Sequence, residues 1–142
     1  MPERIAPKVS RLLETAIYVD DLDVAVEFYN RVFGFSTLHR DRRVAAFDAG
    51  AATVLLLFRR GASLTEQVLP GGVIPPHDSS GPAHFCFAID AEQLHTWEAH
   101  LASQGVSIEN RVKWGLGGES IYFRDPDQHL VELGTPGIWR TY

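Results

Sequence analysis

Three side chains that can bind a metal ion, Glu14, His84 and Glu132, occur in separate apolar segments of the chain. Carboxylate and imidazole groups suit the divalent ions of Mn, Fe, Co, Ni and Zn. Two carboxylates and one imidazole would leave coordination positions open for water or substrate, as a catalytic metal site requires. Because the three residues are far apart in sequence, the elements that carry them decide whether such a site can form.

Each of the three residues lies in a run that predicts a β-strand. Side chains alternate between the two faces of a strand, and this alternation puts Glu14, His84 and Glu132 on the less apolar face of their runs. The alternatives are a solvated Glu14 near the start of an edge strand and a His84 that is satisfied within a core. Glu132 is the strongest candidate, because a glutamate between Val131 and Leu133 needs a partner if it is buried.

The two halves of the sequence repeat each other. Each half begins with a strand-like run, at residues 12–19 and 84–89, and continues with a helical stripe that ends at a glycine. Further strands follow in both halves, and residues 47–57 lie 76 positions before the matching residues 123–133. Such a repeat indicates two copies of one structural unit, neither of which can bury its apolar sheet face alone.

The repeat relates the candidate ligands to one another. Glu14 and His84 occupy equivalent places at the start of the two units, so pairing of the units would bring them together with Glu132. The counterpart of Glu132 in the first unit is Leu56, which cannot bind metal. These positions therefore supply three ligands at most. His129 has the opposite parity to Glu132 and follows a turn, which predicts a surface position.

These patterns predict a single α+β domain over residues 1–142. Two βαβββ modules, at about residues 12–58 and 83–135, would pair into a curved, half-open mixed sheet around a cavity, with the helices outside. Such a concave face suits a small ligand. The stretch between the modules, residues 59–82, is long for a compact domain and predicts a linker or a lid over the cavity. Residues 136–142 form a C-terminal tail.

Three more residues are candidates for contact with a substrate. Tyr122 precedes Glu132 by ten residues. A five-residue hairpin loop would set Tyr122 opposite Glu132 and facing the cavity, whereas a four-residue loop would put Ile121 there. Trp114 lies among glycines and is either an aromatic wall of the cavity or a packing anchor for a loop. His77, in the linker, could reach the cavity as an acid or base, or it could be a solvated loop residue.

Composition narrows the classes of function. With 142 residues, 45% of them hydrophobic and 22% charged, the chain can bury the core of one domain. A net charge of −5 without a basic stripe argues against a nucleic-acid partner. No apolar stretch approaches the roughly 20 residues of a membrane span. Cys86 is the only cysteine and residues 1–10 lack the apolar centre of a signal peptide, so we expect a cytoplasmic protein.

Five segments carry a resemblance to a known family. They are ETAIYVDDL (14–22), FY (28–29), FGF (33–35), AHFCFAID (83–90) and SIYFRDPDQHLVEL (120–133). In this order and spacing the chain resembles the vicinal oxygen chelate superfamily, the group of glyoxalases, bleomycin resistance proteins and ring-cleaving dioxygenases. The resemblance implies a homodimer, since members commonly build the cavity across two chains.

The resemblance also implies roles for the candidate residues. Glu14, His84 and Glu132 would fill three of the superfamily's four metal positions and hold a divalent metal that binds neighbouring oxygens of a small substrate. Glu132 and Tyr122 would take part in catalysis, and Tyr122 would also contact the substrate. The expected activity is that of a glyoxalase-like lyase or isomerase, or of a dioxygenase-like enzyme.

Two departures from the family patterns keep an alternative open. Leu56 stands where glyoxalase I relatives generally have a glutamate that serves in proton transfer. Glu14 stands where ring-cleaving dioxygenases and fosfomycin-modifying transferases begin with a histidine. The alternative is a protein that binds a small molecule or antibiotic without chemistry, like the bleomycin resistance proteins.

Overall fold

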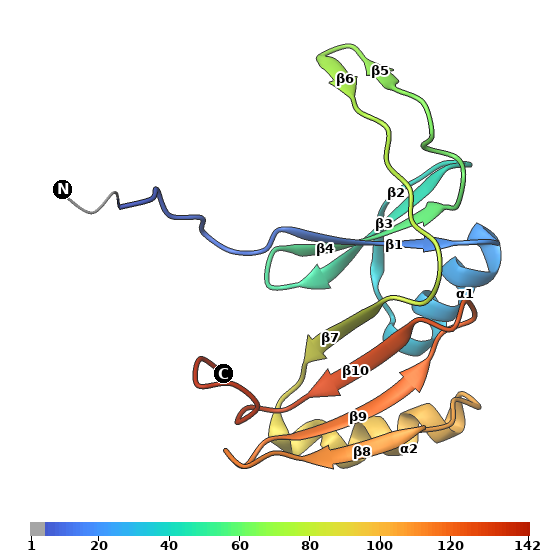
Figure 1. Ribbon diagram of the computed structural model, residues 1–142. Coiled ribbons are helices and arrows are strands. Elements are labelled where there is room, and N and C mark those ends of the chain that lie inside the picture. Colours follow the sequence, from blue (N-terminus) through green and yellow to red (C-terminus); the bar gives the residue numbers. More distant parts are fainter. Residues whose placement is uncertain (1–4) are drawn as a thin grey trace.

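Each half of the chain folds into its own four-stranded sheet with one helix, as Figure 1 shows for the computed structural model of the protein, which describes residues 5–142. The strand order is β1-β4-β3-β2 in the first sheet and β7-β10-β9-β8 in the second. The elements are β1 (Glu14–Val19), α1 (Leu22–Phe33), β2 (Ser36–Arg40), β3 (Val44–Gly50), β4 (Thr53–Arg59), β5 (Gln67–Leu69), β6 (Gly72–Ile74), β7 (His84–Ala88), a 3₁₀ turn (Ala91–Gln93), α2 (Leu94–Ser103), β8 (Asn110–Lys113), β9 (Glu119–Arg124) and β10 (Leu130–Gly134).

The two sheets share one pairing scheme, which confirms the repeat and the α+β class. β1 runs parallel to β4 and β7 runs parallel to β10, whereas the other neighbours are antiparallel. Glu14 pairs with Val54 and His84 pairs with Leu130, two partners that are themselves equivalent in the repeat. Glu14 and His84 therefore occupy equivalent positions, at the first residue of β1 and of β7.

Helix α1 forms where its apolar stripe and its end residues predict it. The Asp21 side chain accepts a hydrogen bond from the Val24 N–H at 3.2 Å and caps the first turn. Gly34 ends the helix in the left-handed region, with φ of 64°, and its N–H donates to the Asn30 carbonyl. The buried face of the helix is the predicted stripe of Leu22, Ala25, Val26, Phe28, Tyr29 and Val32.

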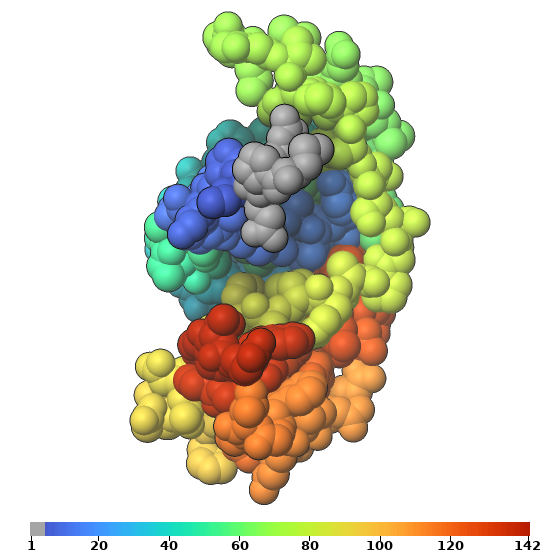
Figure 2. Space-filling view, turned by 60° about the vertical axis from the view of Figure 1, so that its left-hand side comes forward, coloured from blue at the N-terminus to red at the C-terminus, as the bar shows by residue number. Residues whose placement is uncertain are grey.

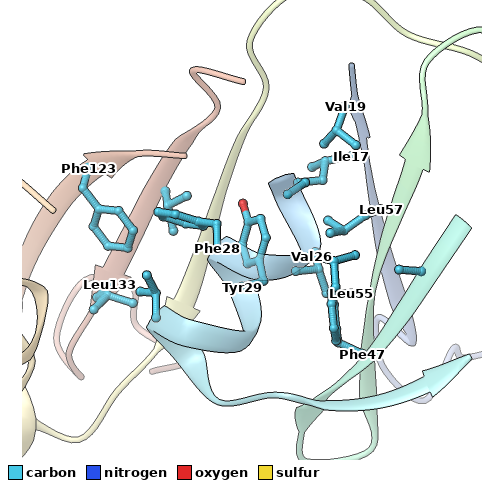
Figure 3. Close-up of a cluster of buried hydrophobic side chains, with 14 of the residues drawn as sticks. Ile17, Val19, Val26, Phe28, Tyr29, Phe47, Leu55, Leu57, Phe123 and Leu133 are labelled. Atoms are coloured by element: carbon cyan, nitrogen blue, oxygen red, sulfur yellow. The ribbon is translucent and has the colours of Figure 1, made fainter. Parts of the chain in front are cut away.

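One core joins the two sheets, with α1 between them (Figure 3). Ile17, Leu55 and Leu57 of the first sheet lie on one side of the helix, and Phe123 and Leu133 of the second sheet lie on the other. At the end of α1, the ring centroid of Phe33 is 4.9 Å from that of Phe87 and 6.1 Å from that of Phe123. Because each sheet turns one face to this shared core, its opposite face is left open.

Buried polar contacts fix the junction between the halves. The Tyr29 hydroxyl donates to an Asp125 carboxylate oxygen at 2.7 Å, and the other oxygen accepts the His129 N–H. The His129 ring accepts the Ala83 N–H at Nδ1 and donates from Nε2 to the Tyr18 carbonyl, both at 2.8 Å. The ring is therefore held as one neutral tautomer that links the second half to the first.

The predicted surface position of His129 is wrong, because the residue is only 2% exposed. Its parity does turn it away from the open face of β10. However, the turn that carries it packs against the end of β1 in the other half of the chain, so the side of the turn that faces away from the cavity is covered rather than solvated.

A short hairpin, β5–β6, stands within the segment that the sequence predicts as a linker or lid. Its strands pair in register from Gln67 with Ile74 to Leu69 with Gly72. Figure 2 shows the hairpin standing out from the body, with the chain that follows it running along the side of the molecule toward the second sheet. Val68 on this hairpin is 77% exposed. Among residues 5–142, neither helix is long and apolar enough to cross a bilayer.

Candidate metal and substrate site

His84 and Glu132 meet on the open face of the second sheet. Parallel pairing of β7 with β10 sets His84 beside Leu130 and Cys86 beside Glu132. In this register the His84 Nε2 atom lies 3.2 Å from the Glu132 Oε1 atom. Glu132 is buried, whereas half of the His84 side chain is exposed. The sequence prediction that these two residues approach each other is supported by this distance.

The hydrogen bonding of His84 leaves its second ring nitrogen as an acceptor close to the Glu132 carboxylate. Its Nδ1 atom lies 2.9 Å from the Leu130 carbonyl oxygen, which can only accept, so Nδ1 carries the proton. In the neutral ring Nε2 then has a lone pair and no proton. That acceptor lies 3.2 Å from a carboxylate oxygen of Glu132, and a metal ion bound by both groups would bring the positive charge that two neighbouring acceptors attract. The donor set fits a divalent transition metal.

The second oxygen of Glu132 is held by a relay of two residues. The Ser120 hydroxyl donates to Oε2 of Glu132, and its oxygen accepts the indole N–H of Trp114 at 2.9 Å. Ser120 is fully buried. The sequence predicts Trp114 as a wall or an anchor but gives no role to Ser120. Strand alternation could have found Ser120, because it shares a face with Tyr122 two residues later.

Tyr122 lies opposite Glu132 on the neighbouring strand. β9 and β10 pair from Ser120 with Gly134 to Arg124 with Leu130, which leaves a five-residue loop between them. The five-residue loop therefore places Tyr122, and not Ile121, opposite Glu132. Burial, followed by the nearby Glu132 carboxylate, raises the pKa of Tyr122 above its usual value of 10. Its phenol is therefore neutral at pH 7 and can donate a hydrogen bond.

These groups line a cavity of about 570 Å³ with largely aromatic walls. His84, Glu132, Tyr122 and Trp114 contribute to it, and Cys86 lies at its floor. The C-terminal tail forms a further wall with Ile138, Trp139 and Tyr142. This wall has no signal in the sequence, because it depends on how the chain turns after β10.

Two glycines bring the tail to the cavity. The Gly118 N–H donates to the Gly137 carbonyl at 3.1 Å, so the loop after Trp114 and the tail touch through their main chains. A Cβ atom on Gly137 would lie 2.5 Å from the Gly118 nitrogen, and a Cβ on Gly118 would lie 2.6 Å from the Gly137 carbonyl carbon. Gly137 also has a φ of 103°, which disfavours any other residue.

Glu14 lies on the open face of the first sheet and is exposed. Ala16 and Tyr18 share this face along β1, and Leu56 lies beside Ala16 on β4. Within residues 5–142 of a single chain, no three His, Cys, Asp or Glu side chains gather as a metal site. The structure therefore brings His84 and Glu132 together and leaves Glu14 apart, since the two ligand-bearing faces belong to sheets that are joined through their other sides.

His77 also lies outside the cavity of His84 and Glu132. Its Nδ1 atom lies 2.6 Å from the Tyr18 hydroxyl, and its ring packs edge-on against Phe58 at a centroid distance of 4.6 Å. Tyr18 and Phe58 are paired neighbours on the open face that bears Glu14. The linker thus places His77 at the far end of the first sheet's open face. Tyr18 has no predicted role, although its parity with Glu14 could have indicated one.

A family model described as the Glyoxalase/Bleomycin resistance protein/Dioxygenase superfamily matches residues 11–133. The chain belongs to this superfamily. Metallothiol transferase FosB of Bacillus licheniformis is 33% identical over 122 residues, which cover 85% of this chain and 72% of that protein. Catechol-2,3-dioxygenase of Bacillus subtilis is 28% identical over 120 residues, which cover 81% of this chain and 38% of that protein. The crystal structure of lactoylglutathione lyase from Agrobacterium tumefaciens is similar to this fold with a TM-score of 0.86. The two sequences are 32% identical, and the match covers 94% of this chain and 99% of that chain.

The one thiol of this superfamily member is not an activated nucleophile. Burial, and then the neighbouring Glu132 carboxylate, raise the pKa of Cys86 to about 12. At neutral pH the residue is therefore a thiol, and the thiolate is the nucleophilic form. Cys86 shapes the floor of the cavity, whereas the polar chemistry of the cavity is carried by His84, Glu132, Ser120 and Tyr122.

Proposed function

We propose that the protein is a divalent-metal-dependent enzyme that acts on a small, oxygen-rich organic molecule. The observation that carries the proposal is the pair of neighbouring acceptors, His84 Nε2 and Glu132 Oε1, which lie 3.2 Å apart. A divalent ion such as Mn, Fe, Co, Ni or Zn would act there as a Lewis acid toward neighbouring oxygens of the substrate. His84 and Glu132 would hold it, with the Nδ1 proton of His84 fixed by the Leu130 carbonyl.

A homodimer would supply the third ligand. Glu14 has the same register in the first sheet that His84 has in the second, and it is exposed on an open face. We propose that Glu14 of the partner subunit completes the site when the open face of one chain's first sheet meets the open face of the other chain's second sheet. Two such sites form in a symmetric dimer, because the contact is the same for both copies.

The chain's own residues would bind and orient the substrate. Tyr122 would donate its phenol hydrogen to a substrate oxygen, because its raised pKa keeps it neutral. Ser120 and Trp114 hold Glu132 in one orientation, and the aromatic walls exclude water from the cavity. Leu56 offers no base on the opposing face, which argues against a proton transfer of the glyoxalase I type.

The relatives leave two reaction classes for this chain. One relative is named a metallothiol transferase and another a lactoylglutathione lyase, and both names refer to a thiol or to a thiol compound. The third is named a dioxygenase. Because Cys86 is held as a thiol with a pKa of about 12, any thiol in the reaction would come from a second substrate. We therefore favour a reaction in which any nucleophile comes from a second substrate over one that uses a nucleophile of the protein.

Metal titration of the purified chain tests the proposal. Isothermal titration calorimetry with Mn²⁺ should show saturable binding, and His84→Gln should weaken it at least tenfold. His95→Gln is the matched control, since that side chain is 95% exposed on α2 and does not line the cavity. Absence of binding for all five ions, or equal loss in both variants, would overturn the metal site.

Mixing two variants tests the dimer. Glu14→Gln and His84→Gln each damage every site in their own homodimers. In a mixed dimer one site carries both substitutions and the other carries neither, if each site is shared between chains. Unfolding and refolding an equal mixture of the two variants should thus restore Mn²⁺ binding at about a quarter of the sites by random pairing. No recovery in a mixture shown by mass spectrometry to contain mixed dimers would contradict a shared site.

The binding-protein alternative remains the second candidate because of the aromatic cavity. Trp114, Tyr122 and Trp139 could enclose a planar ligand without any metal. This alternative predicts that ligand binding, followed by tryptophan fluorescence, is unchanged by EDTA. Loss of ligand binding in EDTA and its return with Mn²⁺ would favour the enzyme.

A further inference from the structure

A second cavity, of about 350 Å³, lies at the root of the β5–β6 hairpin. Its polar lining consists of Arg43, Ser63, Thr65, Glu66, Gln67 and His77. None of the residues around it belongs to the cavity of His84 and Glu132. It is therefore a distinct site, formed where the linker between the two modules folds back onto the first sheet.

Arg43 brings an incompletely paired positive charge to this cavity. One guanidinium nitrogen, Nη1, donates to the Ser63 hydroxyl at 2.9 Å, and the guanidinium carbon lies 5.6 Å from the centre of the Phe58 ring. Across residues 5–142, no carboxylate forms an ion pair with Arg43. A guanidinium has five N–H donors, so a fixed and half-buried fork has donors left for an occupant.

Gln67, which lines the cavity, carries a buried amide oxygen without a hydrogen bond to any group in residues 5–142. In the part of the chain that the structure describes, its Oε1 atom is the buried side-chain oxygen or nitrogen without a hydrogen bond. Buried polar groups are nearly always paired, and an exception indicates a missing water, ion or ligand. Rotation of the amide exchanges oxygen and nitrogen. Because a carboxylate can only accept, Gln67 would contact it through the amide nitrogen.

His77 and Ser63 add neutral donors. Burial, and then the charge of Asp78, raise the pKa of Tyr18, so its phenol keeps its proton. When that proton is donated to Nδ1 of His77 at 2.6 Å, the ring carries its own proton on Nε2. Ser63 is buried, and its oxygen accepts from Arg43, which leaves its hydroxyl hydrogen free to donate.

We propose that this cavity binds a carboxylate group. One guanidinium, a hydroxyl and an imidazole match the charge and the acceptor pattern of a single carboxylate. Glu66, which is exposed and also lines the cavity, disfavours a doubly charged anion such as phosphate.

The cavity would also set the length of the substrate, a role that rests on the proposed metal site. Tyr18 follows Glu14 by four residues on the same face of β1, which is about 13 Å along a strand. Tyr18 does not line the cavity itself, but its hydroxyl lies 2.6 Å from Nδ1 of His77, which does. A substrate that occupies both the metal site and the carboxylate cavity would therefore carry its carboxylate about 13 Å from the oxygens held at the metal. The substrate class is thus an elongated carboxylic acid with its reacting oxygens at the other end.

Titration of the metal-free, ¹⁵N-labelled protein with acetate tests the carboxylate site independently of the metal. Acetamide has the same shape without the charge and serves as the control ligand. Amide resonances of Arg43, Ser63, Gln67 and His77 should shift saturably with acetate and remain unchanged with acetamide. Arg43→Gln should abolish these shifts. Arg42→Gln, which removes a neighbouring exposed arginine outside the cavity, should leave them intact.

Two outcomes would overturn the carboxylate site. One is the absence of saturable shifts with acetate, and the other is an equal loss of binding in Arg43→Gln and Arg42→Gln, which would indicate general attraction to surface charge. If Arg43→Gln proves unfolded by circular dichroism, Ser63→Ala, which keeps the charge, should weaken acetate binding at least threefold, and unchanged binding would count against the site. Failure of Mn²⁺ binding leaves this result untouched, so the two proposals fail separately.

Discussion

Removal of the Ser120 hydroxyl should weaken metal binding although Ser120 would not touch the metal. In Ser120→Ala the Oε2 atom of Glu132 loses its donor, and the Trp114 indole N–H loses its acceptor. Glu132 is buried, so water cannot freely replace the lost donor. The carboxylate then becomes free to rotate away from His84, and the ligand pair loses its fixed geometry.

The expected size follows from the kind of hydrogen bond that is lost. A hydrogen bond to a charged group contributes about 1.5–3 kcal/mol. Second-sphere residues of metal sites typically change metal affinity by about 10–100-fold, or roughly 1.4–2.7 kcal/mol. The two ranges overlap, so we expect the Kd for Mn²⁺ to rise by about one to two orders of magnitude.

Calorimetric titration with Mn²⁺ of the wild type, Ser120→Ala and Ser107→Ala measures the effect. Ser107 is exposed and does not line the cavity, so its hydroxyl should not affect Mn²⁺ binding. Trp114→Phe provides a graded case, because Ser120 would keep its own bond to Glu132 and only the outer donor would be lost. A Kd for Ser120→Ala within twofold of the wild-type value, in a folded protein that binds Mn²⁺, would refute the positioning role of Ser120.

Three further results are expected. Tyr29→Phe should lower the free energy of unfolding by about 1–3 kcal/mol, because the buried Asp125 loses its 2.7 Å donor; a urea titration that shows less than 0.5 kcal/mol of change, roughly the scale of neutral surface substitutions, would contradict this. Cys86, with a pKa of about 12 instead of 9.0, should react with iodoacetamide about 50-fold more slowly than an unperturbed thiol at pH 7.5, since the loss of thiolate outweighs its greater nucleophilicity. A rate equal to that of free cysteine would contradict the raised pKa of this thiol. Burial raises the pKa of Asp41, but hydrogen bonds from His39 and from two main-chain N–H groups outweigh this and lower it to about 2. Its stabilising contribution is therefore complete above its unfolded pKa of about 3.9 and is lost as the pH falls toward 2, and Asp41→Asn should show a smaller loss of stability between pH 4 and pH 2.

The sequence contains much of the fold because its signals are local. The apolar stripe of α1, its Asp21 cap and its Gly34 end are short-range features, and all of them are confirmed. The repeat places Glu14 and His84 at equivalent strand positions, which the register confirms. The position of Tyr122 depends on one loop length, so the sequence could only reduce it to two alternatives.

The features that the sequence does not reveal depend on long-range packing. His129 bonds to Tyr18 across 111 residues, and nothing near it in the chain indicates that contact. The tail wall of Trp139 and Tyr142 depends on the path of the chain after β10. Strand parity assigns Glu14 to an open face, but it carries no information on how whole sheets associate.

The contact between Gly118 and Gly137 fixes the path of the C-terminal tail, whereas the side chains after Gly137 decide which groups the tail presents to the cavity. Because the two backbones touch directly, a side chain at either position would push the tail off the cavity, whatever that side chain is. Ile138 and Trp139, which come next, are under no such constraint, so one wall of the cavity can be exchanged residue by residue while its scaffold stays in place. Related proteins that keep both glycines could therefore differ in the ligands they accept through the tail alone, and a library of tail variants is a direct route to altered selectivity.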